Sequence, residues 1–280
     1  MLAMEFPATR LCQTLRVSRS GYYAWVKRKP SQRELSDQKL LPVIAQVHSQ
    51  SRCAYGSPRL TRELKRRDYS CGRHRIARLM RQAGLRGLQK RSFRPRTTDS
   101  NHQLPIAPNR LKHQPQPVAP DRVWVADMTY IATVQGWLYL AAVMDLYSRK
   151  IVGWAVADHL KSSLPHRALS RALQTRRPCR GLVHHSDRGV QYASQHYNAL
   201  LQSNQLLSSM SAPGHCYDNA AMESFFSTLK TELLHRHSWS SHAQVELALF
   251  DYIETFYNRR RLHSALNYQS PSEFEANARN

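Results

Sequence analysis

Long apolar runs are missing from this chain of 280 residues. The longest clean run, Leu138–Met144, covers seven residues and stops at Asp145, whereas a membrane-spanning helix needs about 20 apolar residues. The first stretch, Met1–Leu15, lacks the apolar centre of a secretory signal peptide. The sequence therefore predicts no membrane partner and a cytoplasmic location.

Cysteine is also scarce, and its spacing excludes two kinds of small stabilised fold. The five cysteines are scattered, odd in number and never arranged as C-x-x-C, which suits a reducing compartment and argues against a disulfide framework. Of the residues that could be combined into a zinc site, only Cys71 and His74 have the close spacing that structural zinc requires. A zinc site is therefore not expected.

Acidic residues are few, and their scarcity is uneven along the chain. Lys and Arg number 41 against 19 Asp and Glu, for a net charge of +22 and a pI near 10.4. Residues 1–120 hold 25 of the basic residues but only 6 of the acidic ones. So many uncompensated charges in one region favour a polyanionic partner over a merely solvated surface. DNA is the predicted partner.

Residues 1–90 are predicted to form short helices arranged as helix-turn-helix units. Leu11 and Leu15 share one helical face, and Ser18 is placed to N-cap a second helix that contains Trp25. Two small helices that pack against another part of the chain would give the same pattern. Alone, this unit indicates DNA binding only weakly.

A second helix-turn-helix unit is predicted over residues 57–84, with Ser57 as its first N-cap. The helix before it is predicted over residues 37–50, although Pro42 favours a start near Leu41. The exposed face of the unit is expected to carry four arginines, at a density that suits phosphate contacts: Arg73, Arg75, Arg78 and Arg81.

The pattern changes twice after this helical region. Residues 91–120 contain six prolines and no apolar periodicity, which predicts an extended basic linker able to follow a DNA backbone. Residues 121–280 then read as an α/β core, with helices covering both faces of a sheet. Its predicted strands are residues 122–131, 137–146, 151–157, 181–185 and 206–209. Its predicted helices are residues 162–175, 194–203, 218–235 and 242–259.

Three acidic residues of the core are the candidate catalytic groups. Asp127 lies within a strand among apolar neighbours, where a charge is costly. Asp187 follows a short strand, at the edge where α/β sites form. Glu223 begins a polar stripe on a helix that also carries Lys230, seven residues later. If the three carboxylates meet, they repel one another unless a cation lies between them.

Hard oxygen ligands of this kind suit Mg²⁺ or Mn²⁺, and two such ions can act on both oxygens of an in-line phosphoryl displacement. The competing interpretation is three ordinary surface or capping acids, with Asp187 in a turn and Asp218 as a helix N-cap. Each acid alone fits that interpretation. The order of the fold and the DNA-seeking charge together favour the metal site, which we expect to bind two ions.

Four stretches around these acids resemble the OrfB-type transposases of insertion sequence family three, which have a core similar to retroviral integrases. The stretches are W-V-A-D-M-T-Y-I from Trp124, H-S-D-R-G-V-Q-Y from His185, D-N-A-A-M-E-S-F-F from Asp218 and Y-N-R-R-R-L-H-S-A-L from Tyr257. The similarity extends to Y-G-S-P-R-L from Tyr55 and covers nearly the whole chain. An acid triad with 35 residues between its last two members is specific to this group.

The resemblance implies an RNase H-like fold with a D-D-E triad at Asp127, Asp187 and Glu223, and Mg²⁺-dependent strand transfer by a DNA 3′-hydroxyl. It also implies a homo-oligomer on the DNA of the bacterial nucleoid and an upstream OrfA partner, whose leucine-zipper heptads this chain lacks. Residues expected to contact phosphate are Lys230, Arg259, Arg260 and Arg261.

Other polar residues near the triad receive structural interpretations. Asp145 is expected to be structural, with its charge neutralised by Arg149, and His184 and His185 are expected to brace the Asp187 loop. Two alternatives to a transposase remain open at this point. One is a metal-dependent nuclease with the same fold, and the other is a non-catalytic DNA-binding regulator.

Overall fold

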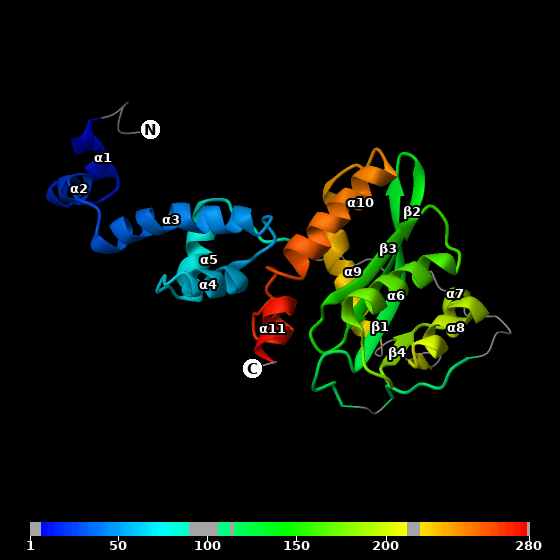
Figure 1. Cartoon of the computed structure of the whole chain (residues 1–280). Helices are drawn as coiled ribbons and strands as arrows, with labels where there is room; N and C mark the ends of the chain where they lie inside the picture. Colours follow the sequence, from blue (N-terminus) through cyan, green and yellow to red (C-terminus); the bar gives the residue numbers. More distant parts are fainter. Residues whose placement is uncertain (1–6, 90–105, 113–114, 212–218, 279–280) are drawn as a thin grey trace.

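The computed structural model describes residues 7–89, 106–112, 115–211 and 219–278. The predicted linker at residues 91–105, the predicted N-cap Asp218 and Cys216 lie outside the described residues. Within them, the chain begins with helices and continues as a mixed sheet with helices on both sides (Figure 1). No helix in the described part is both long and apolar enough to span a bilayer.

Five helices make up the first part of the chain. They are α1 (Ala8–Thr14), α2 (Arg19–Val26), α3 (Gln32–Gln50), α4 (Ser57–Arg66) and α5 (Arg73–Gln82). Ser18 caps α2 as predicted, because its hydroxyl accepts the Gly21 N–H. The α4 helix instead begins at Ser57 with Gly56 as N-cap, so the predicted cap was one residue late.

The α3 helix starts earlier than the proline suggested. Ser31 and Glu34 form a reciprocal capping box at its N-terminus, and Pro42 lies inside the helix. Proline removes one backbone donor and leaves the carbonyl four residues earlier without a partner. That residue, Gln38, is exposed, so water can satisfy its carbonyl.

The core is one five-stranded sheet in the order β3-β2-β1-β4-β5. Its strands are β1 (Val123–Thr133), β2 (Gly136–Asp145), β3 (Ile151–Ala157), β4 (Val183–Ser186) and β5 (Leu207–Met210). The first three strands are antiparallel, and β4 and β5 run parallel to β1. A mixed sheet of this kind places β4 beside β1, although about fifty residues separate them.

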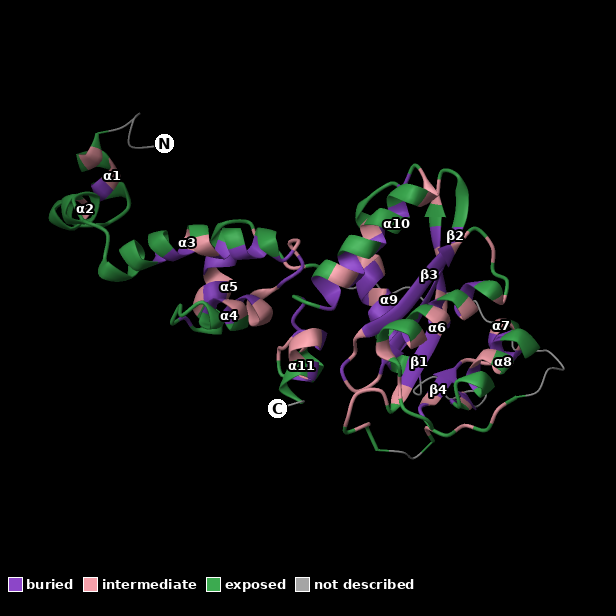
Figure 2. Ribbon diagram, in the orientation of Figure 1, coloured by how far each residue is buried: buried purple, intermediate pink, exposed green. Residues whose placement is uncertain are grey.

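Helices cover both faces of this sheet. They are α6 (Ser163–Arg176), α7 (Val190–Ala193), α8 (Gln195–Ser203), α9 (Ala220–Glu232), α10 (His242–Phe250) and α11 (Pro271–Asn277). A π-helical segment, η4 (Asp251–Tyr257), continues α10, and short 3₁₀ turns η3 (Leu234–Arg236) and η5 (Ser264–Leu266) flank this region. One apolar cluster lies under α6 and α8, and another lies under α9 and α10. Figure 2 shows the strands buried between these layers.

The helical unit α3–α5 packs against the last part of the chain. Its buried residues belong to the same apolar cluster as those of α9 and α10. Tyr55 accepts the Leu262 N–H at 2.7 Å and donates to the Arg260 carbonyl at 3.2 Å. Arg52 pairs with Asp251 at 2.6 Å. By contrast, α1 and α2 lie at the far end from the sheet (Figure 1), and Cys12 is their single buried residue.

Candidate active site

Asp127 lies on β1, opposite Ala142 of the neighbouring strand. Its carboxylate accepts the Met128 N–H at 2.7 Å. Burial, followed by the negative charges of Asp187 and Glu223, raises the pKa of Asp127 to about 8, although the Met128 N–H and the charge of Lys230 act in the opposite direction. The carboxylate therefore has too little positive charge around it.

The pairing of the two parallel strands brings the second acid beside the first. Val125 of β1 is opposite His185 of β4, and Asp127 and Asp187 each follow two residues later. The Asp187 carboxylate accepts the Gly189 N–H at 3.0 Å. A β-carbon at position 189 would lie 3.0 Å from the same oxygen, so glycine lets the turn close over the carboxylate.

The third acid comes from the opposite layer. Glu223 lies in the first turn of α9, which packs against β1, and its side chain is exposed. Its charge contributes to the raised pKa of Asp127. Among the described residues, no three His, Cys, Asp or Glu side chains are grouped closely enough to hold one metal ion. The charges of both other acids therefore act on Asp127, but the three carboxylates do not lie close enough together to hold one metal ion.

Two histidines support the strand that leads to Asp187. Burial and the neighbouring His185 lower the pKa of His184 to about 3, so its ring is uncharged at neutral pH. His184 contacts the Tyr197 hydroxyl at 3.0 Å. His185 lies between the hydroxyls of Ser209 and Ser211, at 2.8 and 3.0 Å. Both rings fasten β4 to its surroundings, as the sequence predicted.

Lys230 lies beside the acids rather than in solvent. It is two helical turns after Glu223, and its ammonium lies 4.9 Å from the centre of the Tyr130 ring on β1. Burial lowers the pKa of Lys230, and the negative charge of Asp127 opposes this shift. An ammonium in this position faces the same space as the carboxylates. Its contact with DNA remains a prediction.

One residue near the acids was not singled out from the sequence. Tyr192, in α7, is 1% exposed, and its hydroxyl has no hydrogen-bond partner among the described residues. Burial raises its pKa, and the charges of Tyr197, Asp127 and Asp187 raise it further. The hydroxyl thus lies close to two of the acids. The feature of the sequence that could have identified Tyr192 was its position at the end of the H-S-D-R-G-V-Q-Y stretch.

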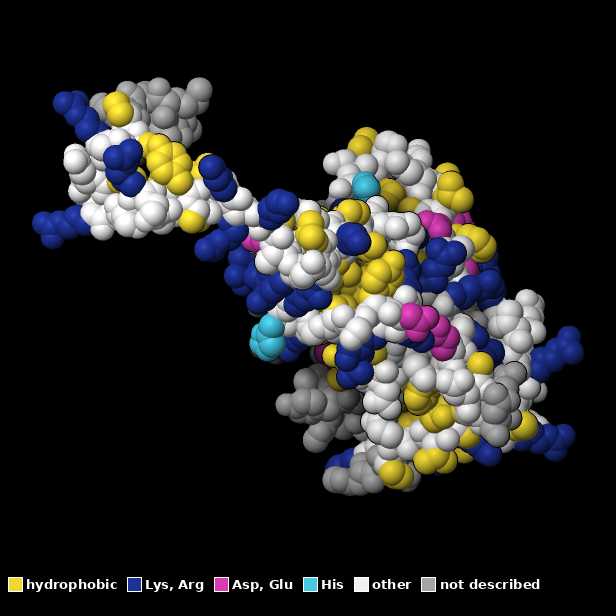
Figure 3. All heavy atoms as spheres, turned by 90° about the vertical axis from the view of Figure 1, so that its left-hand side faces the viewer, with side chains coloured by type: hydrophobic (Ala, Val, Ile, Leu, Met, Phe, Trp, Pro, Cys, Tyr) yellow, Lys and Arg dark blue, Asp and Glu magenta, His cyan; other side chains and the backbone are white. Residues whose placement is uncertain are grey.

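The predicted DNA-contacting arginines divide into exposed and engaged groups. Arg73 and Arg81 are exposed on α5. Arg75 and Arg78 instead pair with Asp37 at 2.6 and 2.5 Å. All four were predicted on the exposed face of the unit, but Arg75 and Arg78 are only half-exposed, because Asp37 of α3 lies against them. Contact of any of the four with DNA remains a prediction. Figure 3 shows that Lys and Arg far outnumber Asp and Glu on this side of the molecule.

The arginines near the chain end also differ from one another. Arg259 and Arg260 are exposed, as phosphate contact requires. Arg261 is 4% exposed and pairs with Glu232 through two contacts of 2.7 and 2.8 Å. The expected phosphate contact of Arg261 was wrong, since its guanidinium is already used inside the protein.

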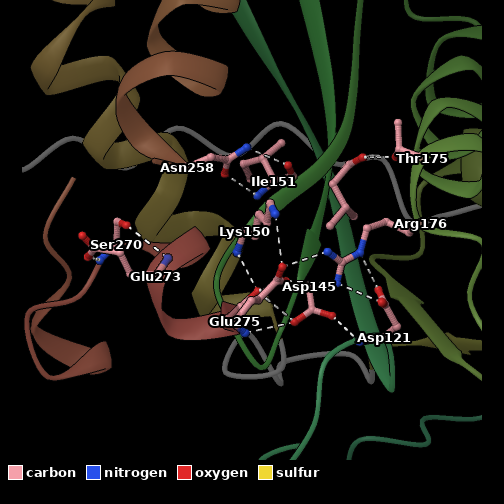
Figure 4. Close-up of polar contacts among 12 residues, drawn as sticks. Asp121, Asp145, Lys150, Ile151, Thr175, Arg176, Asn258, Ser270, Glu273 and Glu275 are labelled. Atoms are coloured by element: carbon pink, nitrogen blue, oxygen red, sulfur yellow. Dashed lines mark hydrogen bonds and ion pairs between the residues drawn. The ribbon is translucent and has the colours of Figure 1, made fainter. Parts of the chain in front are cut away.

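Asp145 is structural, but Arg149 is not its partner. The carboxylate accepts the Asp121 N–H at 2.6 Å and the Ser148 N–H at 2.9 Å. No ion pair joins it to Arg149 among the described residues. Figure 4 shows Asp145 within a network that includes Glu275. Backbone N–H groups therefore stabilise the Asp145 carboxylate, in place of the Arg149 guanidinium that the sequence predicted.

Comparison with known protein families agrees with this arrangement. Residues 117–216 match the family described as integrase core domain, and residues 204–271 match a second family of that description. Residues 35–93 match the family described as HTH-like domain. These matches confirm the predicted RNase H-like core and the helix-turn-helix region before it.

Two curated proteins are similar to the chain over nearly its whole length. One is the insertion element IS600 uncharacterized 31 kDa protein of Shigella sonnei, at 47% identity, covering 94% of this chain and 97% of that protein. The other is the transposase InsF for insertion sequence IS3A of Escherichia coli (strain K12), at 40% identity, covering 97% and 94%.

Two solved structures are reported as similar to the chain. A chain of the simian T-cell lymphotropic virus intasome, in complex with PP2A regulatory subunit B56 gamma, has a TM-score of 0.49 at 16% identity, covering 83% of this chain and 74% of that one. The HTLV-2 integrase catalytic core domain in complex with magnesium has a TM-score of 0.44 at 15% identity, covering 56% and 97%.

Proposed function

Because the chain belongs to the IS3 family of insertion-sequence transposases, we propose that it cuts DNA at the ends of its element and joins those ends to a target. In the joining step, the oxygen of a DNA 3′-hydroxyl forms a new bond to a phosphorus of the target. The bond from that phosphorus to the target 3′-oxygen breaks, and the released oxygen takes up the proton lost by the attacking hydroxyl. One phosphodiester replaces another, so no external energy source is needed.

The observation that supports this proposal is the raised pKa of Asp127. A half-buried carboxylate that is close to two other carboxylates is short of a cation, and carboxylate oxygens are the donors that Mg²⁺ and Mn²⁺ prefer. Asp127, Asp187 and Glu223 supply donors of this type, and an ion would have to draw the three carboxylates closer together than they lie here. Bound ions would supply Lewis-acid polarisation of the reacting phosphate.

The protein residues would prepare this chemistry by position and charge. The Met128 and Gly189 N–H groups orient the carboxylates of Asp127 and Asp187. The neutral ring of His184 holds β4 without adding a positive charge. Lys230, beside Asp127, would bind the phosphate next to the one that reacts.

A nuclease is the second candidate, since the same acids would support attack by water in place of a 3′-hydroxyl. The two differ in their product, because only strand transfer joins two DNA molecules. A non-catalytic regulator is the third candidate and would use the basic residues of α1–α5 alone. Nothing in a regulator requires the carboxylate arrangement around Asp127.

The decisive experiment uses Glu223→Gln with labelled element ends, target DNA and Mg²⁺. Joined product should disappear while DNA binding persists, because the substitution removes one charge from an exposed side chain. Glu246→Gln, on the exposed face of α10, is the matched control and should join DNA like the wild type. Cleavage by the wild-type protein without any joined product would indicate the nuclease. Unchanged activity in Glu223→Gln would exclude catalysis by this site.

The remaining proposals concern assembly. We expect the protein to act as a homo-oligomer on DNA in the bacterial nucleoid, together with the product of the upstream reading frame. A mobility-shift assay on element ends, with and without that product, tests the partnership. Equal affinity and sequence preference in both conditions would contradict it.

A further inference from the structure

The described lining of a cavity of about 1230 Å³ includes none of Asp127, Asp187 and Glu223. Segments that are distant in sequence meet there, among them α4, the turn between β2 and β3, α9 and the chain after η4. Its described lining includes five arginines, among them Arg59 and Arg149, but one acid, Glu232. A cavity lined by charges of one sign concentrates ions of the other sign.

The single acid is already committed. Glu232 accepts two hydrogen bonds from Arg261 and a third from the Tyr252 hydroxyl at 2.8 Å. No described acidic side chain lies within ion-pair distance of Arg59 or Arg149. Burial lowers the pKa of both arginines, the nearby charge of Arg261 lowers that of Arg59 further, and the charge of Glu232 opposes the shift in Arg59. These two guanidinium groups therefore lie partly desolvated, and no described acidic side chain forms an ion pair with either of them.

A buried donor or acceptor completes the cluster. The Nε2 atom of His263 is buried and has no hydrogen-bond partner among the described residues. Its ring lies 4.8 Å from the Tyr257 ring, edge to face. Burial and the charges of Arg261, Arg59 and Arg149 together lower the pKa of His263 to about 2. The charges of these three arginines therefore all act on the His263 ring.

We propose that this cavity binds a phosphate group of the DNA backbone, held by Arg59 and Arg149 with the His263 Nε2–H as a third donor. Arginine contacts phosphate in a bidentate manner, and an anion would relieve the repulsion among these charges. The inference rests on the proposed function, since it names DNA as the occupant.

The extent of the cavity favours a DNA strand over a free anion. It continues along the flank of α9, where Ser224, Thr228 and Thr231 line it. Hydroxyl groups are common contacts to phosphate and sugar. Ser224 directly follows Glu223, so a strand in the cavity would lie along the helix that supplies the third acid. Residues from α4 and from the core would then bind the same strand.

The test measures DNA affinity of the full chain across a salt series, with a fluorescein-labelled duplex of random sequence. Arg59→Gln and Arg149→Gln should each lower the slope of log affinity against log salt by about 0.9, the value for one lost phosphate contact. Arg149→Lys should restore most of the slope. Arg180→Gln, exposed and outside the cavity lining, is the matched control for charge loss and should leave the slope near that of the wild type.

Thermal unfolding without DNA separates binding from structure. A guanidinium that lacks a counter-charge contributes nothing to an ion pair, so both Gln variants should unfold at or above the wild-type temperature. Slopes equal to that of the wild type in both variants would overturn the proposal. So would stabilisation by inorganic phosphate that depends on Arg149 while the DNA slopes stay unchanged, because the cavity would then hold a free anion. Glu223→Gln should retain the full slope, so failure here and failure of the catalytic proposal are distinguishable.

Discussion

Two groups of acids, one beside the start of β1 and one near its middle, are treated in opposite ways. At the start of the strand, burial would raise the pKa of Glu275, but hydrogen bonds from Arg176 and Ser148 and the charge of Lys150 lower it overall. Further along, burial and the other two acids raise the pKa of Asp127 to about 8. The buried carboxylate of Glu275 is compensated by the protein, and the half-buried carboxylate of Asp127 is left short of positive charge.

The difference separates acids that hold the fold from acids that serve chemistry. Arg176 reaches both oxygens of Glu275 at 2.8 and 3.0 Å and also pairs with Asp121 at 2.8 Å (Figure 4). This network joins α6, α11 and the start of β1. Around Asp127, the half-buried Lys230 is a cation whose charge lowers the pKa of the carboxyl, and it does not offset burial and the two acids. Perturbed pKa values of this second kind are typical of functional sites.

The largest expected effect comes from removing the uncompensated charge. Asp127→Asn should reduce strand joining roughly 10³-fold, since one carboxylate of the ligand set is lost. The variant should remain folded, because it removes repulsion rather than an ion pair. Joined product on gels and the thermal midpoint together check this expectation. A midpoint well below that of the wild type would show that Asp127 holds the fold, and the comparison with Glu275 would fail.

The second effect is on stability rather than activity. Glu275→Gln should lower the free energy of unfolding by about 3 kcal/mol, because it leaves Arg176 and Lys150 beside a neutral group. Glu273→Gln, on the same helix, is the matched control. Glu273 pairs with the exposed Arg66, so its loss should cost under about 1 kcal/mol. Urea titrations at neutral pH measure both, and equal losses would contradict the assignment.

The third effect is a dependence of stability on pH. Because folding raises the pKa of Asp127 from 3.8 to about 8, the folded chain holds a proton that the unfolded chain has lost within this window. Wild-type stability should therefore fall as pH rises from about 5 to about 8, and Asp127→Asn should gain roughly 2 kcal/mol relative to it. Added Mg²⁺ should remove most of that difference. Parallel pH curves for the two proteins would contradict the raised pKa.

The smallest effect distinguishes the arginines of α5. Arg81→Gln should reduce the salt slope of DNA binding by about 1, because Arg81 is exposed and has no described ion-pair partner. Arg75→Gln should lower the thermal midpoint more than Arg81→Gln does, since Arg75 holds Asp37 at 2.6 Å. Equal thermal midpoints and equal salt slopes for the two variants would mean that the ion pair of Arg75 with Asp37 affects neither stability nor DNA binding.

The order of the elements could be predicted because it depends on local pattern. The strand Ile151–Ala157 has the predicted bounds, and Ser194 caps α8 through the Tyr197 N–H. Apolar alternation and capping residues act over a few positions, so a single sequence records them. The approach of Asp127 and Asp187 follows from the same information once β4 is placed beside β1.

Charge partners could not be predicted in this way. Helical periodicity placed Arg75 and Arg78 on one face but did not show that Asp37, about forty residues earlier, would lie against it. The pairing of Arg261 with Glu232 depends likewise on how α9 and the chain after η4 pack. The helix predicted over residues 242–259 does extend to Tyr257, but its second half, Asp251–Tyr257, is π-helical, which the periodicity did not predict.

The docking of α3–α5 on the end of the chain has a consequence for synthesis on the ribosome. Tyr55 and Arg66 have their partners at Leu262 and Glu273, each 207 positions away. The first helical unit therefore emerges from the ribosome long before the residues against which it packs. A nascent chain would display its basic helices in a loose arrangement until residues 262–273 have left the exit tunnel. Contact with these later residues then fixes the geometry of the helical unit.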